Sequence, residues 1–316
     1  MLFNSMPYAI FLPSIFILYW IIPQKKRWIL LLVGSYYFYM SWNYKYVVLI
    51  FYTTIVSYVA ALLLERTKKK YLKNIILMVT LVLCLGVLFV FKYYNFALGS
   101  LAHIIPFEPH YFKILLPVGV SFYTFQTLSY VIDVYKGDID VEKHFGIYAT
   151  FISFFPQLVA GPIERSSNLL PQIREKHNFH LENAYYGVHL ILWGLFKKMI
   201  IADRLNILVK TVFSNYVDLS GPVIFFGAIS YTIMLYMDFS GAMDVVLGIG
   251  DIFKVRVPEN FKQPFFSKNV SEFWTRWHIS LGTWFRDYIY YPVSLSKPMK
   301  SLTLKLRKYV GNHYGP

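Results

Sequence analysis

The stretch YVVLIFYTTIVSYVAALLL, from Tyr46 to Leu64, carries no charged residue, and its only polar groups are hydroxyls. About 20 apolar residues in a row are enough to cross the hydrocarbon core of a bilayer as a helix. Five basic residues follow within the next few positions: Arg66, Lys68, Lys69, Lys70 and Lys73. An apolar run that ends in a basic cluster indicates a membrane-spanning helix whose end lies at the cytoplasmic surface.

Further apolar runs lie on both sides of this stretch. They are Phe3–Ile22, Trp28–Met40, Ile75–Phe91, Ile114–Val134, Tyr185–Ala202 and Pro222–Ile249. Charged residues make up 15% of the 316-residue chain, whereas soluble domains carry about 25%. The shorter run Phe145–Ala160 allows a re-entrant segment, which is tolerated where protein buries its backbone. We therefore predict an all-α, polytopic integral membrane protein in which residues 1–316 form one membrane domain.

The net charge of +14 comes from basic residues that gather between the apolar runs, at Lys25–Arg27, Arg66–Lys73 and Lys297–Lys308. By the positive-inside rule the first two clusters face the cytoplasm, which puts the N-terminus outside. This distribution does not indicate a nucleic-acid partner, because a nucleic-acid surface gathers its charge on one folded face. Cys84 is the only cysteine, so an intrachain disulfide is excluded.

Three polar side chains interrupt apolar runs and are candidates for function. Gln126 either forms a hydrogen bond between neighbouring helices or lines a polar path for a substrate. Asp238 and Asp244 lie in the run Pro222–Ile249. A carboxylate at membrane depth faces a partner or a cavity. The structural interpretation of these two residues is an ion pair with an arginine of another segment, and the functional one is contact with substrate.

Two further charged pairs have simpler interpretations. Glu164 and Arg165 follow a glycine-proline turn, and we expect them at the cytoplasmic interface. Lys197 and Lys198 interrupt the run Tyr185–Ala202. They either extend toward the lipid headgroups or face an acidic partner.

The richest stretch, from Glu272 to Tyr288, combines tryptophans, two arginines, an aspartate and His278. If the stretch is one helix, His278 shares a face with Leu281 and Phe285. A histidine beside aromatic rings is either a packed core residue or a functional group. Its ordinary pKa near 6.5 suits a general base, and its ring nitrogens also suit hydrogen bonding to a substrate. No phosphate-binding loop occurs in the sequence, which disfavours ATP-driven transport.

Several motifs in order resemble one family over essentially the whole chain. They are PVGVSFYTFQTLSYVIDVY (117–135), AGPIER (160–165), GLFKK (194–198), YMDFSG (236–241), PENFKQPF (258–265), WTRWH (274–278) and WFRDY (284–288). The set is similar to the membrane-bound O-acyltransferase family. Its bacterial branch for alginate O-acetylation and teichoic acid D-alanylation is the most similar part.

The resemblance implies transfer of an acyl group, with acetyl as the expected one, from a cytoplasmic thioester donor to hydroxyls of an extracytoplasmic polysaccharide. The donor is acetyl-CoA or an acyl carrier protein, and no bound cofactor or metal is expected. His278 matches a family histidine with a supporting or substrate-positioning role. We assign substrate-binding roles to Trp277, Arg286, Asp287, Asp238 and Gln126. Expected partners in the bacterial cell membrane are lipids, an extracytoplasmic acetyltransferase protein and the polysaccharide.

The family's principal catalytic histidine lies further along, in a Trp-His-Gly context within a later apolar helix. After His278 this sequence has only His313, in a basic and polar segment where we expect little backbone order. We therefore expect an incomplete membrane-bound O-acyltransferase domain without its C-terminal spans, which is inactive alone.

Two alternatives come from other functional classes. One is a polysaccharide or lipid flippase, which also needs carboxylates at membrane depth. The other is a non-catalytic membrane scaffold of a cell-envelope complex. Dependence on an acyl donor separates the enzyme from both, because neither alternative uses a thioester.

The charge pattern yields a topology that labelling can test. Single cysteines placed in Lys25–Arg27 or Arg66–Lys73, in a Cys84→Ser background, should resist a membrane-impermeant thiol reagent in intact cells. The reason is that both basic clusters are expected on the cytoplasmic side. The same cysteines should react after the cells are permeabilised, and ready labelling of both loops in intact cells would overturn the topology.

Overall fold

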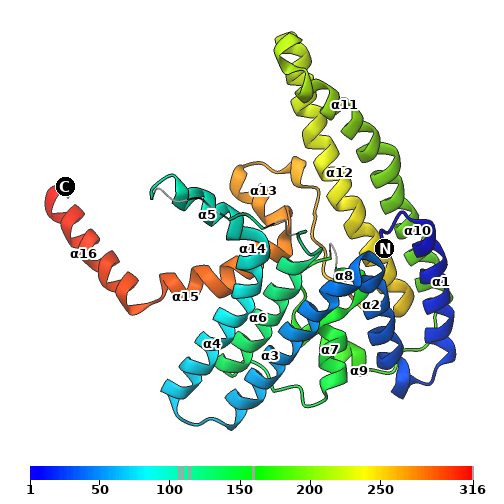
Figure 1. Cartoon of the computed structure of the whole chain (residues 1–316), viewed down its shortest axis with the longest axis horizontal. Coiled ribbons are helices and arrows are strands. Elements are labelled where there is room, and N and C mark those ends of the chain that lie inside the picture. The colour runs from blue at the N-terminus through cyan, green and yellow to red at the C-terminus, as the bar shows by residue number, and fades with distance from the viewer. Residues whose placement is uncertain (106–107, 109, 113–114, 159–160, 315–316) are drawn as a thin grey trace. The chain divides into compact units, whose positions relative to one another are not determined.

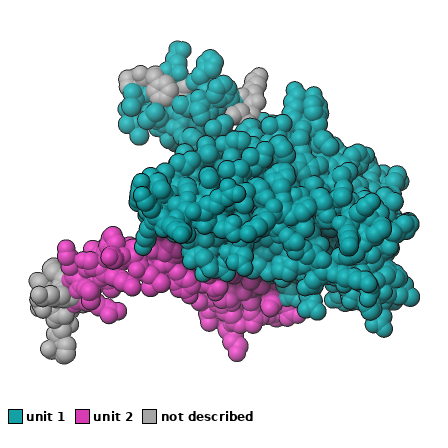
Figure 2. Space-filling model, turned by 90° about the horizontal axis from the view of Figure 1, so that it is seen from below, with its two compact units in different colours: residues 1–259 teal, residues 260–316 magenta. Residues whose placement is uncertain are grey.

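The computed structural model describes residues 1–105, 108, 110–112, 115–158 and 161–314; the side chains of residues 308–314 lie outside the description. The chain forms two compact units, residues 1–259 and residues 260–316 (Figure 2). The prediction of one membrane domain across 1–316 stays a prediction.

The first unit is built from helices (Figure 1). Its α-helices are α1 (Met6–Ile21), α2 (Arg27–Asn43), α3 (Val47–Arg66), α4 (Lys70–Leu88), α5 (Tyr94–Ala102), α6 (Val120–Lys136), α7 (Phe145–Ser153), α8 (Phe155–Leu158), α9 (Ser166–Arg174), α10 (Leu181–Phe196), α11 (Asp203–Ser214) and α12 (Gly221–Phe253). Three helical segments among the described residues are long and apolar enough to cross a membrane: Gln24–Arg66, Lys70–Ala102 and Gly221–Phe253. The all-α membrane fold is thereby confirmed.

The run Ile114–Val134 was predicted as one span, and the structure shortens it. Ile114 lies outside the described residues, and α6 begins only at Val120, after Gly119 in the left-handed region with φ 75°. The helix ends at Gly137, where φ is 82°. There the amides of Gly137 and Asp138 donate to the carbonyls of Val134 and Asp133, a glycine C-cap of the Schellman type.

Residues 144–158 and 161–177 lie beside α2, and both ends of this segment, which we call the hairpin, contact the start of that helix. At the entry the ring of His144 packs on Trp28, near the start of α2, with 4.8 Å between ring centroids. At the exit Arg27 donates to the carbonyl oxygen of His177 over 2.8 Å. Between them the amide of Phe155 donates to Ser35 Oγ, half-way along α2, over 3.0 Å. The hairpin therefore enters and leaves at the same end of α2.

The tip of the hairpin is enclosed by aromatic rings. Phe155 packs edge-on against Phe11 of α1, with 5.3 Å between centroids, and against Phe253 of α12, with 6.0 Å. These contacts join the first helices of the chain to α12. That the run Phe145–Ala160 is re-entrant stays a prediction, and Ala160 itself lies outside the described residues.

The helix that starts as α10 does not stop at the two lysines. It continues through a π-helical turn, Lys197–Ala202, into α11. It lies antiparallel to α12, as Figure 1 shows. At two points the backbones nearly touch: a Cβ added to Gly194 would lie 2.4 Å from the carbonyl oxygen of Gly241, and one added to Gly248 would lie 2.4 Å from that of Gly187. Glycine pairs of this kind allow helices to pack at van der Waals distance in a membrane.

The second unit contains α13 (Val270–Arg276), α14 (Ile279–Phe285), α15 (Tyr291–Ser294) and α16 (Lys297–Tyr314). The low backbone order expected around His313 stays a prediction; in the structure α16 extends to Tyr314. The second unit also carries the described chain's isolated antiparallel bridge, between Phe261 and Trp277.

The glycine contacts predict opposite results for two glycine-to-alanine changes. Gly194→Ala should destabilise the protein by about 1–3 kcal/mol, because an added methyl collides with the backbone of α12. Gly86→Ala in α4 should raise stability slightly, because its Cβ meets nothing within 4 Å and alanine favours the helix. Thermal unfolding of both variants in mild detergent measures the difference. Equal midpoints would contradict the close contact.

Candidate functional site

Asp244 and Asp238 of α12 pair with the two consecutive lysines of the π-helical turn. Lys197 Nζ lies 2.6 Å from Asp244 Oδ2, and Lys198 Nζ lies 2.6 Å from Asp238 Oδ1. Lys198 also lies 3.0 Å from Asp203 Oδ1, so it joins two carboxylates. The expectation of an arginine partner was wrong, because the continuous helix brings lysines to α12. These lysines have partners within the chain itself.

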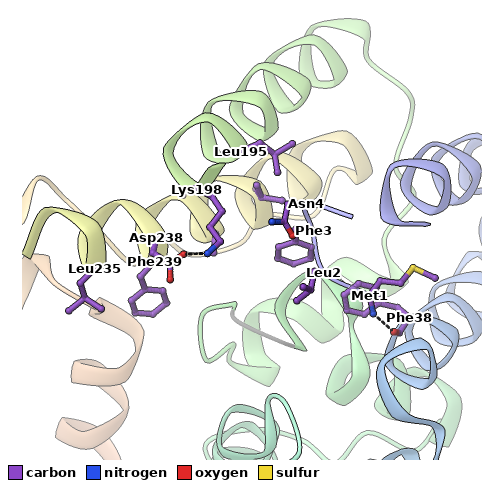
Figure 3. A pocket seen from close by; sticks show the side chains of 13 residues that line it. Met1, Leu2, Phe3, Asn4, Phe38, Leu195, Lys198, Leu235, Asp238 and Phe239 are labelled. Carbon is purple, nitrogen blue, oxygen red and sulfur yellow. Dashed lines mark hydrogen bonds and ion pairs between the residues drawn. The ribbon is translucent and has the colours of Figure 1, made fainter. Parts of the chain in front are cut away.

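Asp238 and Lys198 line a cavity of about 400 Å³ in the first unit. The rest of the lining is mostly apolar and comes from the N-terminal segment, α2, α10 and α12: Met1, Leu2, Phe3, Asn4, Phe38, Leu195, Leu235, Phe239, Gly241, Ala242 and Val245. Figure 3 shows the Lys198 and Asp238 side chains pointing toward each other. Phe3 and Phe38 are among the other lining residues that it labels. A mostly apolar cavity with a few polar groups suits an apolar ligand that has one polar end.

Gln126 has a structural partner. Its side chain is buried, and Nε2 donates to the carbonyl oxygen of Phe151 over 2.8 Å. The bond connects α6 to α7 of the hairpin. Of the two interpretations of Gln126, the hydrogen bond between helices is the one observed.

Glu164 is buried inside the protein, while the expected position of Glu164 and Arg165 at the cytoplasmic interface stays a prediction. Only 1% of its surface is exposed, because it lies on the inner part of the hairpin, ahead of α9. Oε1 accepts from Asn168 Nδ2 over 2.6 Å, while Oε2 has no hydrogen-bond partner among the described residues. Buried carboxyl groups of this kind gather at functional sites. Its position shortly after the apolar run Phe145–Ala160 was the available signal.

The stretch around His278 is not one helix. Trp277 is extended, and His278 has φ 46° and ψ 54°, in the left-handed region. The chain turns here because residues 260–262 pair with it: the carbonyl oxygen of Asn260 accepts from the Ile279 amide over 3.1 Å, and Asn260 Oδ1 accepts from the Ser280 amide over 2.9 Å. His278 therefore precedes α14, and the predicted helical face shared with Leu281 and Phe285 was wrong.

The His278 ring is partly buried. Burial lowers its pKa to about 4, because a low-dielectric surrounding disfavours the charged imidazolium. At neutral pH the imidazole is therefore uncharged, with one nitrogen that donates and one that accepts. Such a ring is a weak base and a good hydrogen-bonding group.

The three predicted site residues near His278 have defined neighbours. Trp277 stacks on Phe273, with 5.6 Å between ring centroids, and meets Phe261 edge-on at 5.0 Å. Arg286 Nε lies 3.0 Å from Asp287 Oδ1. Both belong to a π-helical turn, Arg286–Tyr290, that follows α14. Within the described residues no group of three or more histidine, cysteine, aspartate or glutamate side chains is arranged to hold a metal ion.

A chain of apolar helices with charge pairs and a buried carboxyl group among them is a polytopic integral membrane protein. More specifically, it belongs to the membrane-bound O-acyltransferase family, whose model matches residues 140–306. The match covers the hairpin, the paired helices α10 and α12, and the His278 turn. The family predicted from the motifs is thus confirmed.

Individual relatives come from bacteria, which places the protein in a bacterial cell membrane. The chain is 39% identical to the probable alginate O-acetylase AlgI of Pseudomonas aeruginosa, over 92% of this chain and 56% of that protein. It is 32% identical to the peptidoglycan O-acetyltransferase of Helicobacter pylori, over 93% and 62%. It is 30% identical to the teichoic acid D-alanyltransferase of Bacillus subtilis, over 60% and 48%. The chain thus spans little more than half the length of the first two relatives.

The low pKa of His278 predicts a local loss of stability in acid. The pKa in the folded turn is about 4, below the ordinary 6.5, so the opened turn binds more protons at intermediate pH. The contribution of the uncharged His278 ring to the stability of the folded turn is complete above pH 6.5, and it falls as the pH drops toward 4. Hydrogen exchange of the Ile279 and Ser280 amides, corrected for intrinsic rates, should accelerate over this interval. His278→Asn, which also tolerates a positive φ, should abolish that dependence. Identical pH profiles of amide exchange in the unaltered protein and in His278→Asn would contradict the prediction.

Proposed function

We propose that this chain is part of an enzyme that transfers an acyl group, with acetyl as the expected one, to hydroxyls of an extracytoplasmic polysaccharide. Family membership carries the proposal, because two relatives named as O-acetylating enzymes match more than nine-tenths of the chain. The proposed donor is a cytoplasmic thioester, acetyl-CoA or an acyl carrier protein. An extracytoplasmic acetyltransferase protein is the proposed partner that meets the polymer.

The proposed reaction needs three events at one carbonyl carbon. The acceptor hydroxyl oxygen attacks the thioester carbonyl, and a base takes the hydroxyl proton. Hydrogen-bond donors stabilise the oxyanion that forms. The carbon–sulfur bond then breaks, and the proton ends on the thiolate that leaves. Oxygen is acylated, a thiol is released, and no redox partner is needed.

In this scheme His278 positions a substrate by hydrogen bonding. A neutral ring with a pKa near 4 is a weak base at neutral pH, which disfavours His278 as the group that removes the proton. Its N–H, in contrast, suits an acceptor hydroxyl or the thioester carbonyl. The principal base is then a different residue, as the family resemblance implies.

Asp238 and the residues near His278 are proposed to contact substrates. Asp238 has fixed geometry, since Lys198 holds it at the edge of the mostly apolar cavity. Trp277 offers an aromatic face, and the Arg286–Asp287 pair offers hydrogen bonds to a polar group. For Gln126 we propose the structural role, because Phe151 already accepts from its side-chain amide.

Two substitutions at His278 separate catalysis from backbone geometry. Asparagine and glycine both accept the left-handed conformation, so His278→Asn and His278→Gly keep the turn and remove the ring. In the complete protein, with a labelled thioester donor and matched membrane levels, both should lower acyl transfer by about 10²–10³-fold, the loss expected when one hydrogen-bond donor to the reacting groups is removed. Normal turnover in either variant would return His278 to a packing role. If the unaltered protein moves no label from the donor to the polymer, the flippase or scaffold is favoured instead.

A further inference from the structure

Helix α16, at the end of the second unit, has an unusual charge composition. The sequence from Lys297 to Tyr314 contains no aspartate or glutamate, and its basic residues are Lys297, Lys300, Lys305, Arg307 and Lys308. Ser296 begins the helix, because its carbonyl oxygen accepts from the Lys300 amide over 3.0 Å. The segment is therefore a helix whose charged residues are all basic.

Apolar and basic side chains occupy different faces of α16. Met299, Leu302 and Leu306 follow the spacing of one helical stripe. Lys297 and Lys300 lie on the other side. Leu304 is two residues from Leu302 and so projects from the basic side. All four apolar side chains are exposed in the structure.

We propose that α16 lies along the membrane surface and binds anionic phospholipid. The apolar stripe enters the outer part of the acyl chains, and the basic face contacts headgroup phosphates. Charge complementarity selects an anionic leaflet, since the helix has cations and no anion of its own. The proposal does not depend on acyl transfer and adds a lipid partner to the protein.

The test compares two leucines on one helix. In a Cys84→Ser background, Leu302→Cys and Leu304→Cys each carry a small fluorophore, and the protein is reconstituted into vesicles with phospholipids brominated on their acyl chains. The probe at 302 should be quenched several-fold more than the probe at 304. Because both native side chains are exposed leucines, the pair controls for position along α16.

A second arm varies the lipid charge. Quenching at 302 should increase from phosphatidylcholine vesicles to vesicles that contain phosphatidylglycerol, and salt should reduce the increase. Lys300→Gln combined with Lys305→Gln should remove most of it. Equal quenching at 302 and 304 would overturn the proposal and indicate that the stripe packs on protein. Equal quenching of the probe at 302 in phosphatidylcholine vesicles and in vesicles that contain phosphatidylglycerol would overturn the proposed selectivity for anionic lipid.

Discussion

The backbone contact between α10 and α12 organises the first unit. At Gly194 and Gly241 the two helices approach so closely that no side chain fits between them. The contact repeats seven residues away, at Gly187 and Gly248, so it fixes the register of two long antiparallel helices. That register brings the Lys197 side chain within reach of Asp244 and the Lys198 side chain within reach of Asp238. The ion pairs and the cavity beside them depend on it.

The sequence predicts the helices well because a lipid bilayer restricts the backbone to few structures. A backbone in hydrocarbon satisfies its polar groups only within a helix or a closed barrel, so long apolar runs have little choice. The runs at Phe3, Trp28, Tyr46 and Pro222 correspond to α1, α2, α3 and α12. The contacts between helices were not predicted. The sequence around the α10 glycines does not indicate which helix they contact. The lysine partners of Asp238 and Asp244 were missed for the same reason.

The candidate site was less predictable than the fold. The segment of His278 reads as a helix by composition, but Asn260, far back in the sequence, holds the amides of Ile279 and Ser280 and forces a turn. Glu164 reads as an interfacial charge, but the chain doubles back and encloses it. Both differences arise from contacts distant in sequence. The motifs identified the family because they depend only on the order of residues along the chain. That order is independent of the contacts that form in the fold.

The hairpin beside α2 has a consequence for how the protein is assembled. Its tip relies on Ser35 of α2 for a hydrogen bond and on Phe11 of α1 for packing. A half-inserted loop exposed to lipid alone would leave backbone polar groups without partners. Synthesis from the N-terminus supplies α1 and α2 before residue 144 leaves the ribosome, so these two partners are present when the hairpin forms, and Phe253 of α12 is added later. A circular permutant that begins at α7 would have to insert this loop first, and we expect it to stall at that step during biogenesis.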